Sequence, residues 1–158
     1  MNEAIRLDLP DEAATERLGA ALAARASPLA IYLHGDLGAG KTTLARGMLQ
    51  ALGHEGSVRS PTYTLLEPYR LGGMDCLHLD LYRLADPGEL EFLGLRDFDM
   101  DQVVMIVEWP IHGAGCLPPQ DLDIRLSYAG SGRIAVLEAR SAAGAERLRL
   151  LAVHDEEL

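Results

Sequence analysis

Residues 35–42 read GDLGAGKT and match the phosphate-binding pattern G-x-x-x-x-G-K-[ST]. The preceding run, residues 29–33, is short and wholly apolar, which predicts a buried strand. The residues that follow predict a helix from Lys41 to about Leu52, ended by Gly53. Between a buried strand and a helix, a glycine-rich turn can hold phosphate on its backbone N–H groups and on the positive end of the helix dipole. The stretch therefore predicts an α/β domain built around a phosphate-binding loop.

Each residue type in this loop has a chemical reason to be there. The glycines permit backbone conformations that bring the main chain close to phosphate. Lys41 is the only lysine among 14 basic residues, and it supplies a compact positive charge to the β- and γ-phosphates. Thr42 supplies a hydroxyl to Mg²⁺. A glycine-rich turn that binds nothing would need no lysine here, so we expect a nucleoside triphosphate, and ATP is favoured because no second lysine remains for a guanine-reading motif.

The composition describes a single domain with an acidic surface. The chain has 158 residues, with 24 acidic against 14 basic side chains and a formal charge of -10. We expect one domain over residues 1–158. The charge argues against direct binding of DNA, tRNA or an anionic membrane through a broad basic face. With two cysteines, no signal-peptide pattern and no apolar run long enough to cross a membrane, we expect reduced thiols and a cytoplasmic location.

Hydrophobic periodicity gives the expected order of elements. The expected strands cover residues 5–9, 29–33, 62–69, 76–82, 103–107, 122–128 and 134–139, and the expected helices follow Asp11, Gly40 and Asp86. For the tail after residue 141 we expect one more short element and a frayed acidic end. Continuous apolar runs mixed with alternating ones predict a P-loop NTPase-like domain of three layers, α/β/α, with a mixed, partly parallel sheet and antiparallel hairpins.

Two carboxylates are candidates for chemistry beside the loop. Glu108 ends the apolar run 103–107, and Asp80 shares one face of its strand with His78. We assign Glu108 to the metal shell, mostly through water, and Asp80 to orienting or activating the attacking water. The two roles can also be exchanged. For both residues the simpler interpretation is an exposed carboxylate at the end of a strand.

Other polar features carry weaker signals. Thr62, in the segment SPTYT, is a candidate for contact with the γ-phosphate, and a proline-fixed turn is the equal alternative. Trp109 follows Glu108 and either packs by the nucleotide or fills the core. The histidines and cysteines show no zinc spacing. Six acidic residues against one arginine between residues 86 and 101 indicate a solvated surface.

Five segments together resemble the TsaE family, bacterial P-loop ATPases required for threonylcarbamoyladenosine formation in tRNA. They are GDLGAGKTT (35–43), SPTYTL (60–65), HLDLYRL (78–84), ELEFLGL (89–95) and EWP (108–110), and the similarity runs from about residue 8 to the turn at 132–133. The resemblance implies action with TsaD and TsaB, contact with tRNA only through that complex, and ATP hydrolysis that resets the complex between turnovers. It departs at Leu44, where an aromatic residue often stands, and in the acidic tail.

The resemblance also implies a set of site residues. The expected catalytic residues are Lys41, Asp80 and Glu108, and the expected metal-binding residues are Thr42 and Glu108. The loop motif, the residue analysis above and the resemblance together assign the nucleotide to Glu12, Gly35, Asp36, Leu37, Gly38, Ala39, Gly40, Lys41, Thr42, Thr43, Thr62, Trp109 and Arg133. We expect ATP and Mg²⁺ as cofactors and weak hydrolysis by the chain alone, because no arginine finger stands out in it. A small-molecule kinase and a nucleotide sensor without turnover remain the alternatives.

Overall fold

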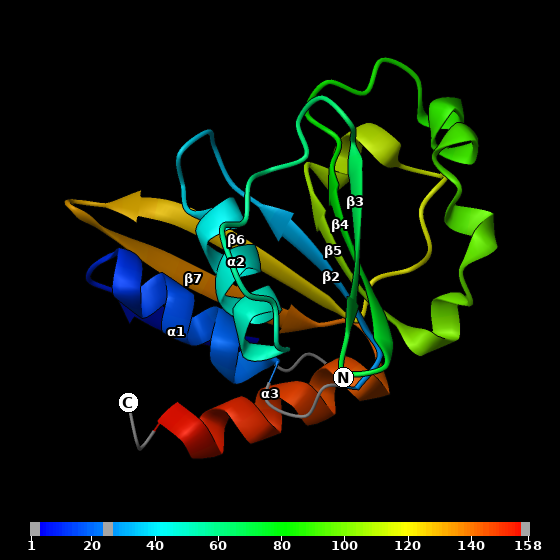
Figure 1. Cartoon of the computed structure of the whole chain (residues 1–158). Coiled ribbons are helices and arrows are strands. Elements are labelled where there is room, and N and C mark those ends of the chain that lie inside the picture. The colour runs from blue at the N-terminus through cyan, green and yellow to red at the C-terminus, as the bar shows by residue number, and fades with distance from the viewer. Residues whose placement is uncertain (1–3, 24–26, 156–158) are drawn as a thin grey trace.

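The computed structural model describes residues 4–23 and 27–155, which build one seven-stranded mixed sheet (Figure 1). The strands are β1 (Ala4–Leu9), β2 (Leu29–His34), β3 (Leu66–Leu71), β4 (Met74–Asp80), β5 (Val103–Glu108), β6 (Leu122–Ala129) and β7 (Gly132–Ala139). Their order is β1-β7-β6-β2-β5-β4-β3. Strands β6, β2, β5 and β4 are parallel neighbours, whereas β1, β7 and β3 pair antiparallel. The expected α/β class with a partly parallel sheet and antiparallel hairpins is confirmed.

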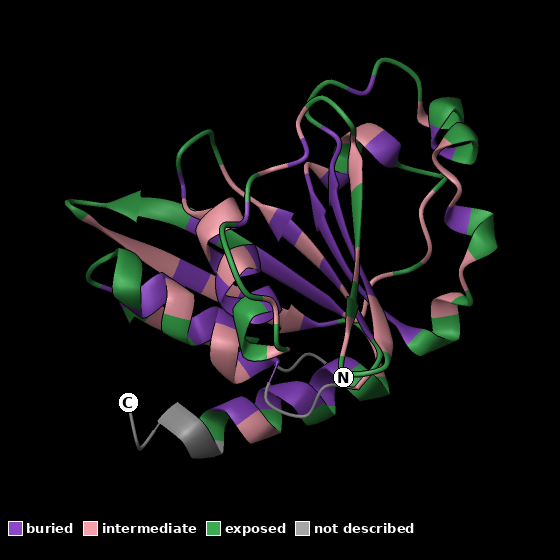
Figure 2. Cartoon of the chain, viewed as in Figure 1, coloured by how far each residue is buried: buried purple, intermediate pink, exposed green. Residues whose placement is uncertain are grey.

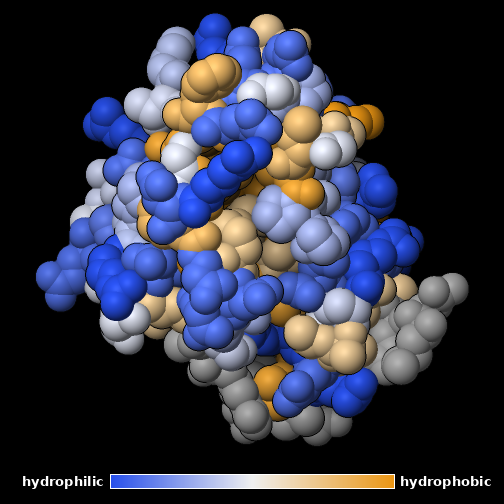
Figure 3. All heavy atoms as spheres, turned by 90° about the vertical axis from the view of Figure 1, so that its right-hand side faces the viewer, coloured by the Kyte–Doolittle hydropathy of each residue, from blue (hydrophilic) through white to orange (hydrophobic). Residues whose placement is uncertain are grey.

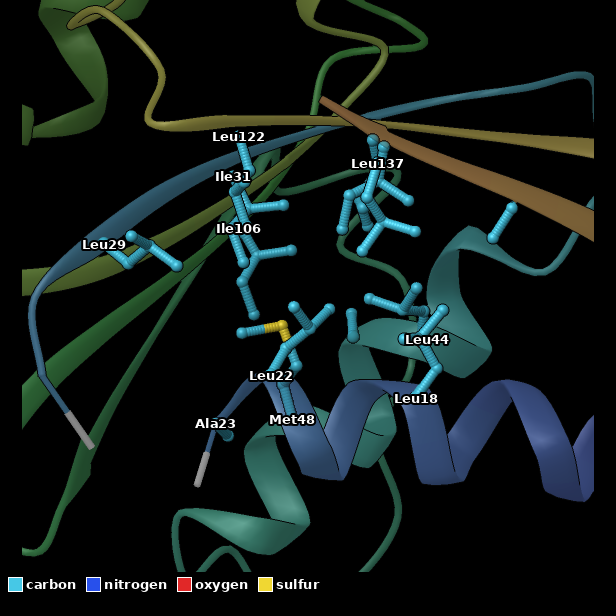
Figure 4. Close-up of a cluster of buried hydrophobic side chains, with 14 of the residues drawn as sticks. Leu18, Leu22, Ala23, Leu29, Ile31, Leu44, Met48, Ile106, Leu122 and Leu137 are labelled. Atoms are coloured by element: carbon cyan, nitrogen blue, oxygen red, sulfur yellow. The ribbon is translucent and has the colours of Figure 1, made fainter. Parts of the chain in front are cut away.

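Three α-helices cover one face of the sheet (Figure 1): α1 (Glu12–Leu22), α2 (Lys41–Ala51) and α3 (Ala142–Asp155). Asp11 begins α1 as expected, because its carboxylate accepts a hydrogen bond from the backbone N–H of Ala14 at 2.8 Å. Leu18 and Leu22 of α1 and Leu44 and Met48 of α2 point toward apolar side chains of the central strands (Figure 4). This core holds α2, and with it the end of the phosphate loop, against the central strands.

The opposite face carries short 3-10 helices in place of α-helices. They are η1 (Pro87–Leu93), η2 (Leu95–Asp97), η3 (Met100–Gln102) and η4 (Pro110–Gly113). Together with their connecting loops they bury a second, smaller core that includes Leu77, Leu79 and Val107. Buried residues accordingly concentrate in the central strands (Figure 2). The third layer therefore exists, but it consists of short 3-10 helices and loops rather than the α-helices that the sequence indicates.

The surface over these 3-10 helices is largely polar. Figure 3 faces this side of the molecule and shows hydrophilic side chains with apolar ones interspersed. The acidic residues between 86 and 101 are all exposed, as expected of a solvated face. Phe92 and Ile111 are large apolar side chains that remain exposed on η1 and η4. No helix within residues 4–23 and 27–155 is both long enough and apolar enough to cross a membrane.

Three expected elements differ from the structure. Strand β3 begins at Leu66 rather than at residue 62, because a turn closes from Leu65 N–H to the Pro61 carbonyl at 2.7 Å and Leu65 has a left-handed φ of 67°. Strand β4 ends at Asp80, so Tyr82 lies outside it. The tail forms the 14-residue helix α3 rather than a short element. The expected frayed end falls on residues 156–158, outside the described residues.

Candidate nucleotide-binding site

The loop of residues 35–40 joins β2 to α2 at the carboxyl end of the parallel strands. Gly40 stands at the N-cap of α2 with φ 106°, a conformation that strains any other residue type. At Gly35 a Cβ would lie 2.6 Å from the Leu126 carbonyl oxygen, so this position has no room for a side chain. The loop thus approaches α2 in a form that leaves the first backbone N–H groups of the helix available to an anion.

A cavity of about 340 Å³ opens in front of the loop. It is lined by Leu37, Gly38, Ala39, Gly40, Lys41, Thr42, Thr43, Ser60, Thr62, Asp80, Tyr82, Glu108 and Trp109. Eleven of the predicted site residues share this wall. They come from four segments that are distant in sequence, so the fold brings together what the motifs indicated separately.

Glu108 lies at the centre of a hydrogen-bonded cluster, although it is only 3% exposed. The hydroxyl of Thr42 lies 3.0 Å from Oε1 and 3.2 Å from Oε2 of its carboxylate. Nε2 of His78 lies 2.7 Å from Oε2, and the hydroxyl of Ser60 lies 3.5 Å from the same oxygen. A serine or threonine hydroxyl paired with a strand-end carboxylate is the donor set that P-loop proteins use for Mg²⁺. The residues present therefore suit that metal.

Asp80 lies beside Glu108, since parallel strands β4 and β5 pair these two residues in register. Its Oδ2 accepts hydrogen bonds from the hydroxyls of Ser60 and of Thr62, the latter at 3.1 Å. Its Oδ1 accepts from the backbone N–H of Tyr82 at 3.1 Å. Neither carboxylate is the exposed strand-end group of the simpler interpretation, because Asp80 is 4% exposed.

Lys41 is buried beneath the loop and close to Trp109. Its ammonium donates to the backbone carbonyls of Gly35 and Asp36, the latter at 3.1 Å. Burial lowers the pKa of Lys41, while the nearby carboxylates of Glu108, Asp80 and Asp36 act in the opposite direction. Trp109 lines the cavity and also packs against the smaller core.

Glu12 and Arg133 line a second cavity, of about 280 Å³, behind the loop. It shares Gly38, Gly40 and Thr43 with the first cavity. Arg133 donates to the Gly38 carbonyl at 3.1 Å, and Glu12 pairs with Arg46 at 2.6 Å. The two cavities therefore meet across the loop.

Apart from Tyr82, which lines the cavity, three residues that form hydrogen bonds in this region were not singled out from the sequence. They are Ser60, which bonds to Asp80; His78, which bonds to Glu108; and Tyr128, whose hydroxyl donates to the Leu37 carbonyl at 2.5 Å. Ser60 stands in the same segment as Thr62, and His78 shares a strand face with Asp80, so both had a local signal. Tyr128 had none, because its contact depends on how the β6–β7 hairpin folds over the loop.

Comparisons with known proteins identify the family. Residues 9–135 match the family described as "Threonylcarbamoyl adenosine biosynthesis protein TsaE". The Haemophilus influenzae protein named "tRNA threonylcarbamoyladenosine biosynthesis protein TsaE" is 44% identical over 148 residues, 90% of this chain and 94% of that protein. The Synechocystis protein of the same name is 44% identical over 117 residues, 70% of this chain and 73% of the relative.

A solved structure matches over nearly the whole length. The crystal structure of Bacillus subtilis YdiB has a TM-score of 0.81 to this fold, is 29% identical, and covers 98% of each chain. The resemblance drawn from the motifs is thereby confirmed, and this chain belongs to the TsaE family.

Proposed function

We propose that this protein binds ATP with Mg²⁺ and hydrolyses it as a cytoplasmic subunit of the machinery that makes threonylcarbamoyladenosine in tRNA, together with TsaD and TsaB. The observation that carries the ATPase part is the convergence of Lys41, Thr42, Asp80 and Glu108 on one cavity. The tRNA part follows from family membership and from the names of the relatives.

The phosphates would be held by the backbone of residues 38–43 and by the ammonium of Lys41. Thr42 and Glu108 would hold Mg²⁺, which when bound neutralises charge on the β- and γ-phosphates. The hydrogen bond between the Thr42 hydroxyl and Glu108 supports this assignment of the metal, because the same carboxylate then orients the hydroxyl that faces the ion.

Asp80 would orient the attacking water. The hydroxyls of Ser60 and Thr62 donate hydrogen bonds to this carboxylate. A change in the conformation of the loop 60–64 would therefore alter the hydrogen bonds of Asp80 directly. Buried beside a second carboxylate, it is an acceptor suited to positioning a water for in-line attack. The hydrogen bonds thus favour Glu108 for the metal and Asp80 for the water over the exchanged roles.

The acidic surface supports an indirect relation to tRNA. The formal charge of this chain is -10, so we expect the partner subunits, rather than this chain, to bind the tRNA. We expect weak hydrolysis alone and a strong rise with TsaD, TsaB and tRNA, because a partner can supply or position the missing groups.

The test follows the γ-phosphate of labelled ATP, first with the protein alone and then with TsaB, TsaD and tRNA. Free phosphate that rises with the partners and disappears in Lys41→Ala supports the proposal. Label that moves to a small-molecule acceptor, with no effect of the partners, would make the protein a kinase. Nucleotide binding without movement of label would make it a sensor.

A further inference from the structure

His78 is a buried side chain that touches the proposed metal carboxylate but not the cavity. It is 0% exposed, and it is absent from the walls of both cavities around the loop. In the β4–β5 ladder Asp80 pairs with Glu108 and His78 pairs with Ile106. His78 therefore lies two residues before Asp80 on the same face of the strand. Its Nε2 reaches diagonally across to Oε2 of Glu108 on β5, at 2.7 Å.

The hydrogen-bond pattern selects one form of the imidazole ring. A carboxylate only accepts, so Nε2 must carry the proton of this bond. Nδ1 has no hydrogen-bond partner among the described residues. In the tautomer protonated on Nε2, Nδ1 is a bare acceptor. The opposite tautomer would bury an unpaired N–H and set a lone pair against the carboxylate, which is the costlier arrangement.

The bond from His78 also gives the two carboxylate oxygens of Glu108 different partners. Oε2 is held by the imidazole inside the sheet, while Oε1 is the oxygen nearer to the Thr42 hydroxyl, at 3.0 Å against 3.2 Å. Without the imidazole, Oε2 would keep only the longer contacts with the hydroxyls of Thr42, at 3.2 Å, and Ser60, at 3.5 Å. Groups behind a metal ligand commonly fix its orientation, and their loss weakens metal binding by about 10- to 100-fold.

We propose that His78 is a positioning residue for Mg²⁺: its Nε2–H holds Glu108 so that the carboxylate and the Thr42 hydroxyl face the cavity together. The inference rests on the proposed function, since it concerns the metal of that same site. It assigns to a residue outside the cavity wall a part in metal affinity that is separate from nucleotide affinity.

The test compares His78→Asn with His78→Gln. The amide of Gln can place an N–H near the position of Nε2, whereas the shorter Asn reaches only the position of Nδ1. His34→Asn is the matched control, because His34 makes the same kind of bond, 2.7 Å to Asp123, from a strand position facing the opposite side of the sheet. Each protein is titrated with MnCl₂ at saturating ADP, and free Mn²⁺ is followed by electron paramagnetic resonance. A fluorescent ADP analogue in EDTA gives the affinity for nucleotide alone.

We expect His78→Asn to raise the dissociation constant for Mn²⁺ by at least about 10-fold, and His78→Gln by no more than about threefold. The affinity for ADP in EDTA should stay within about twofold in both variants, and His34→Asn should bind Mn²⁺ as the natural chain does. The inference would be overturned if His78→Asn and His78→Gln lost the same affinity for Mn²⁺, or if His78→Asn lost none. It would also be overturned if His34→Asn lost as much Mn²⁺ affinity as His78→Asn. A natural chain that binds no nucleotide would instead overturn the proposed function itself.

A second measurement needs no variant and therefore survives a failure of His78→Asn to fold. Long-range nitrogen–proton correlation spectra of the natural chain, with His78 assigned, identify which ring nitrogen carries a proton. We expect a proton on Nε2 and none on Nδ1. A proton on Nδ1 would overturn the arrangement.

Discussion

The ammonium of Lys41 lies 4.0 Å from the centroid of the Trp109 ring, so the only lysine of the chain contacts its only tryptophan. Trp109 has a left-handed φ of 56°, which is unusual for a bulky residue. The rings of Tyr82 and His112 flank it at 5.1 Å and 5.7 Å. The packing thus holds a strained residue in place where it meets the cation that would bind phosphate.

Fluorescence of Trp109 should report nucleotide binding directly. Phosphate binding changes the surroundings of the Lys41 ammonium, so MgATP should change the tryptophan emission of the natural chain. Lys41→Met removes a charged hydrogen bond worth about 2 kcal/mol, so its affinity for MgATP should fall by at least about 10-fold in a competition assay. Arg70→Met, which removes an exposed cation on β3, is the control. Equal affinities of Lys41→Met and the natural chain would contradict the role given to Lys41.

The close packing of α1 on α2 should depend on two glycines. A Cβ on Gly47 would lie 2.2 Å from the Glu16 carbonyl oxygen, and one on Gly19 would lie 2.2 Å from the Leu44 carbonyl oxygen. Gly47→Ala must therefore separate the helices, and we expect a loss of about 1–3 kcal/mol in the free energy of unfolding by urea. Gly88→Ala is the control, since its nearest contact is an ordinary 3.5 Å. A Gly47→Ala variant as stable as Gly88→Ala would show that the helices do not pack this closely.

The sequence was enough to predict that Asp80 and Glu108 both lie beside the loop, but their pairing in register is seen only in the structure. Glu108 was expected at the end of an apolar run and Asp80 on the polar face of the strand 76–82, and both were assigned to the chemistry beside the loop. The loop itself was predictable because the spacing of its glycines and lysine is dictated by phosphate chemistry. What these residues bind remains a prediction.

The parts that escaped the sequence depend on distant contacts. The 3-10 helices opposite α1 and α2 carry weak local signals, and their form depends on packing against Leu77 and Leu79. The hydroxyls of Ser60 and Thr62 both bond to Asp80, a contact between segments that local sequence does not encode. Local propensity cannot supply such geometry, since tertiary packing decides it.

The two cysteines should differ sharply in reactivity. Cys116 is exposed, whereas Cys76 is buried in β4, and burial, aided by Asp75, raises the pKa of the Cys76 thiol to about 11. Iodoacetamide at pH 8 should therefore modify Cys116 in the folded protein and reach Cys76 only after unfolding, as mass spectrometry of the digested protein would show. Cys116→Ser should remove the rapid reaction. Rapid modification of Cys76 in the folded chain would mean that β4 opens far more readily than its burial implies.

Stability at low pH should depend on Asp123. Burial raises the pKa of Asp123, but hydrogen bonds from Arg140, His34 and Gln120 outweigh it and hold the pKa below its ordinary value of 3.8. A carboxyl with a depressed pKa in the folded state contributes stability that is complete above the unfolded-state pKa and is lost as pH falls toward the folded-state pKa.

The loss in unfolding free energy caused by Asp123→Asn should therefore be largest at neutral pH. The difference in unfolding free energy between this variant and the natural chain should shrink as the pH falls below about 5, measured by urea unfolding at each pH. Asp8→Asn, at an exposed position on β1, is the control and should show little difference at neutral pH. A gap that widens toward low pH would mean that the hydrogen bonds of Asp123 favour its protonated form.

Asp80→Asn separates an enzyme from a nucleotide sensor. The amide keeps the size of the side chain, and its oxygen can still accept a hydrogen bond from the Thr62 hydroxyl or the Tyr82 N–H. It loses the charge that would orient or deprotonate water. We expect partner-stimulated phosphate release to fall by about 100-fold or more, while the affinity for MgATP stays within about threefold.

Asp75→Asn is the matched control, because it changes a partly exposed carboxylate on the same strand, β4, away from the cavity. Its phosphate release should match that of the natural chain. Turnover that survives in Asp80→Asn but fails in Glu108→Gln would exchange the two roles and make Glu108 the residue that positions the water. Turnover that survives in both would mean that neither carboxylate activates the water, and the catalytic group would then have to come from a partner subunit.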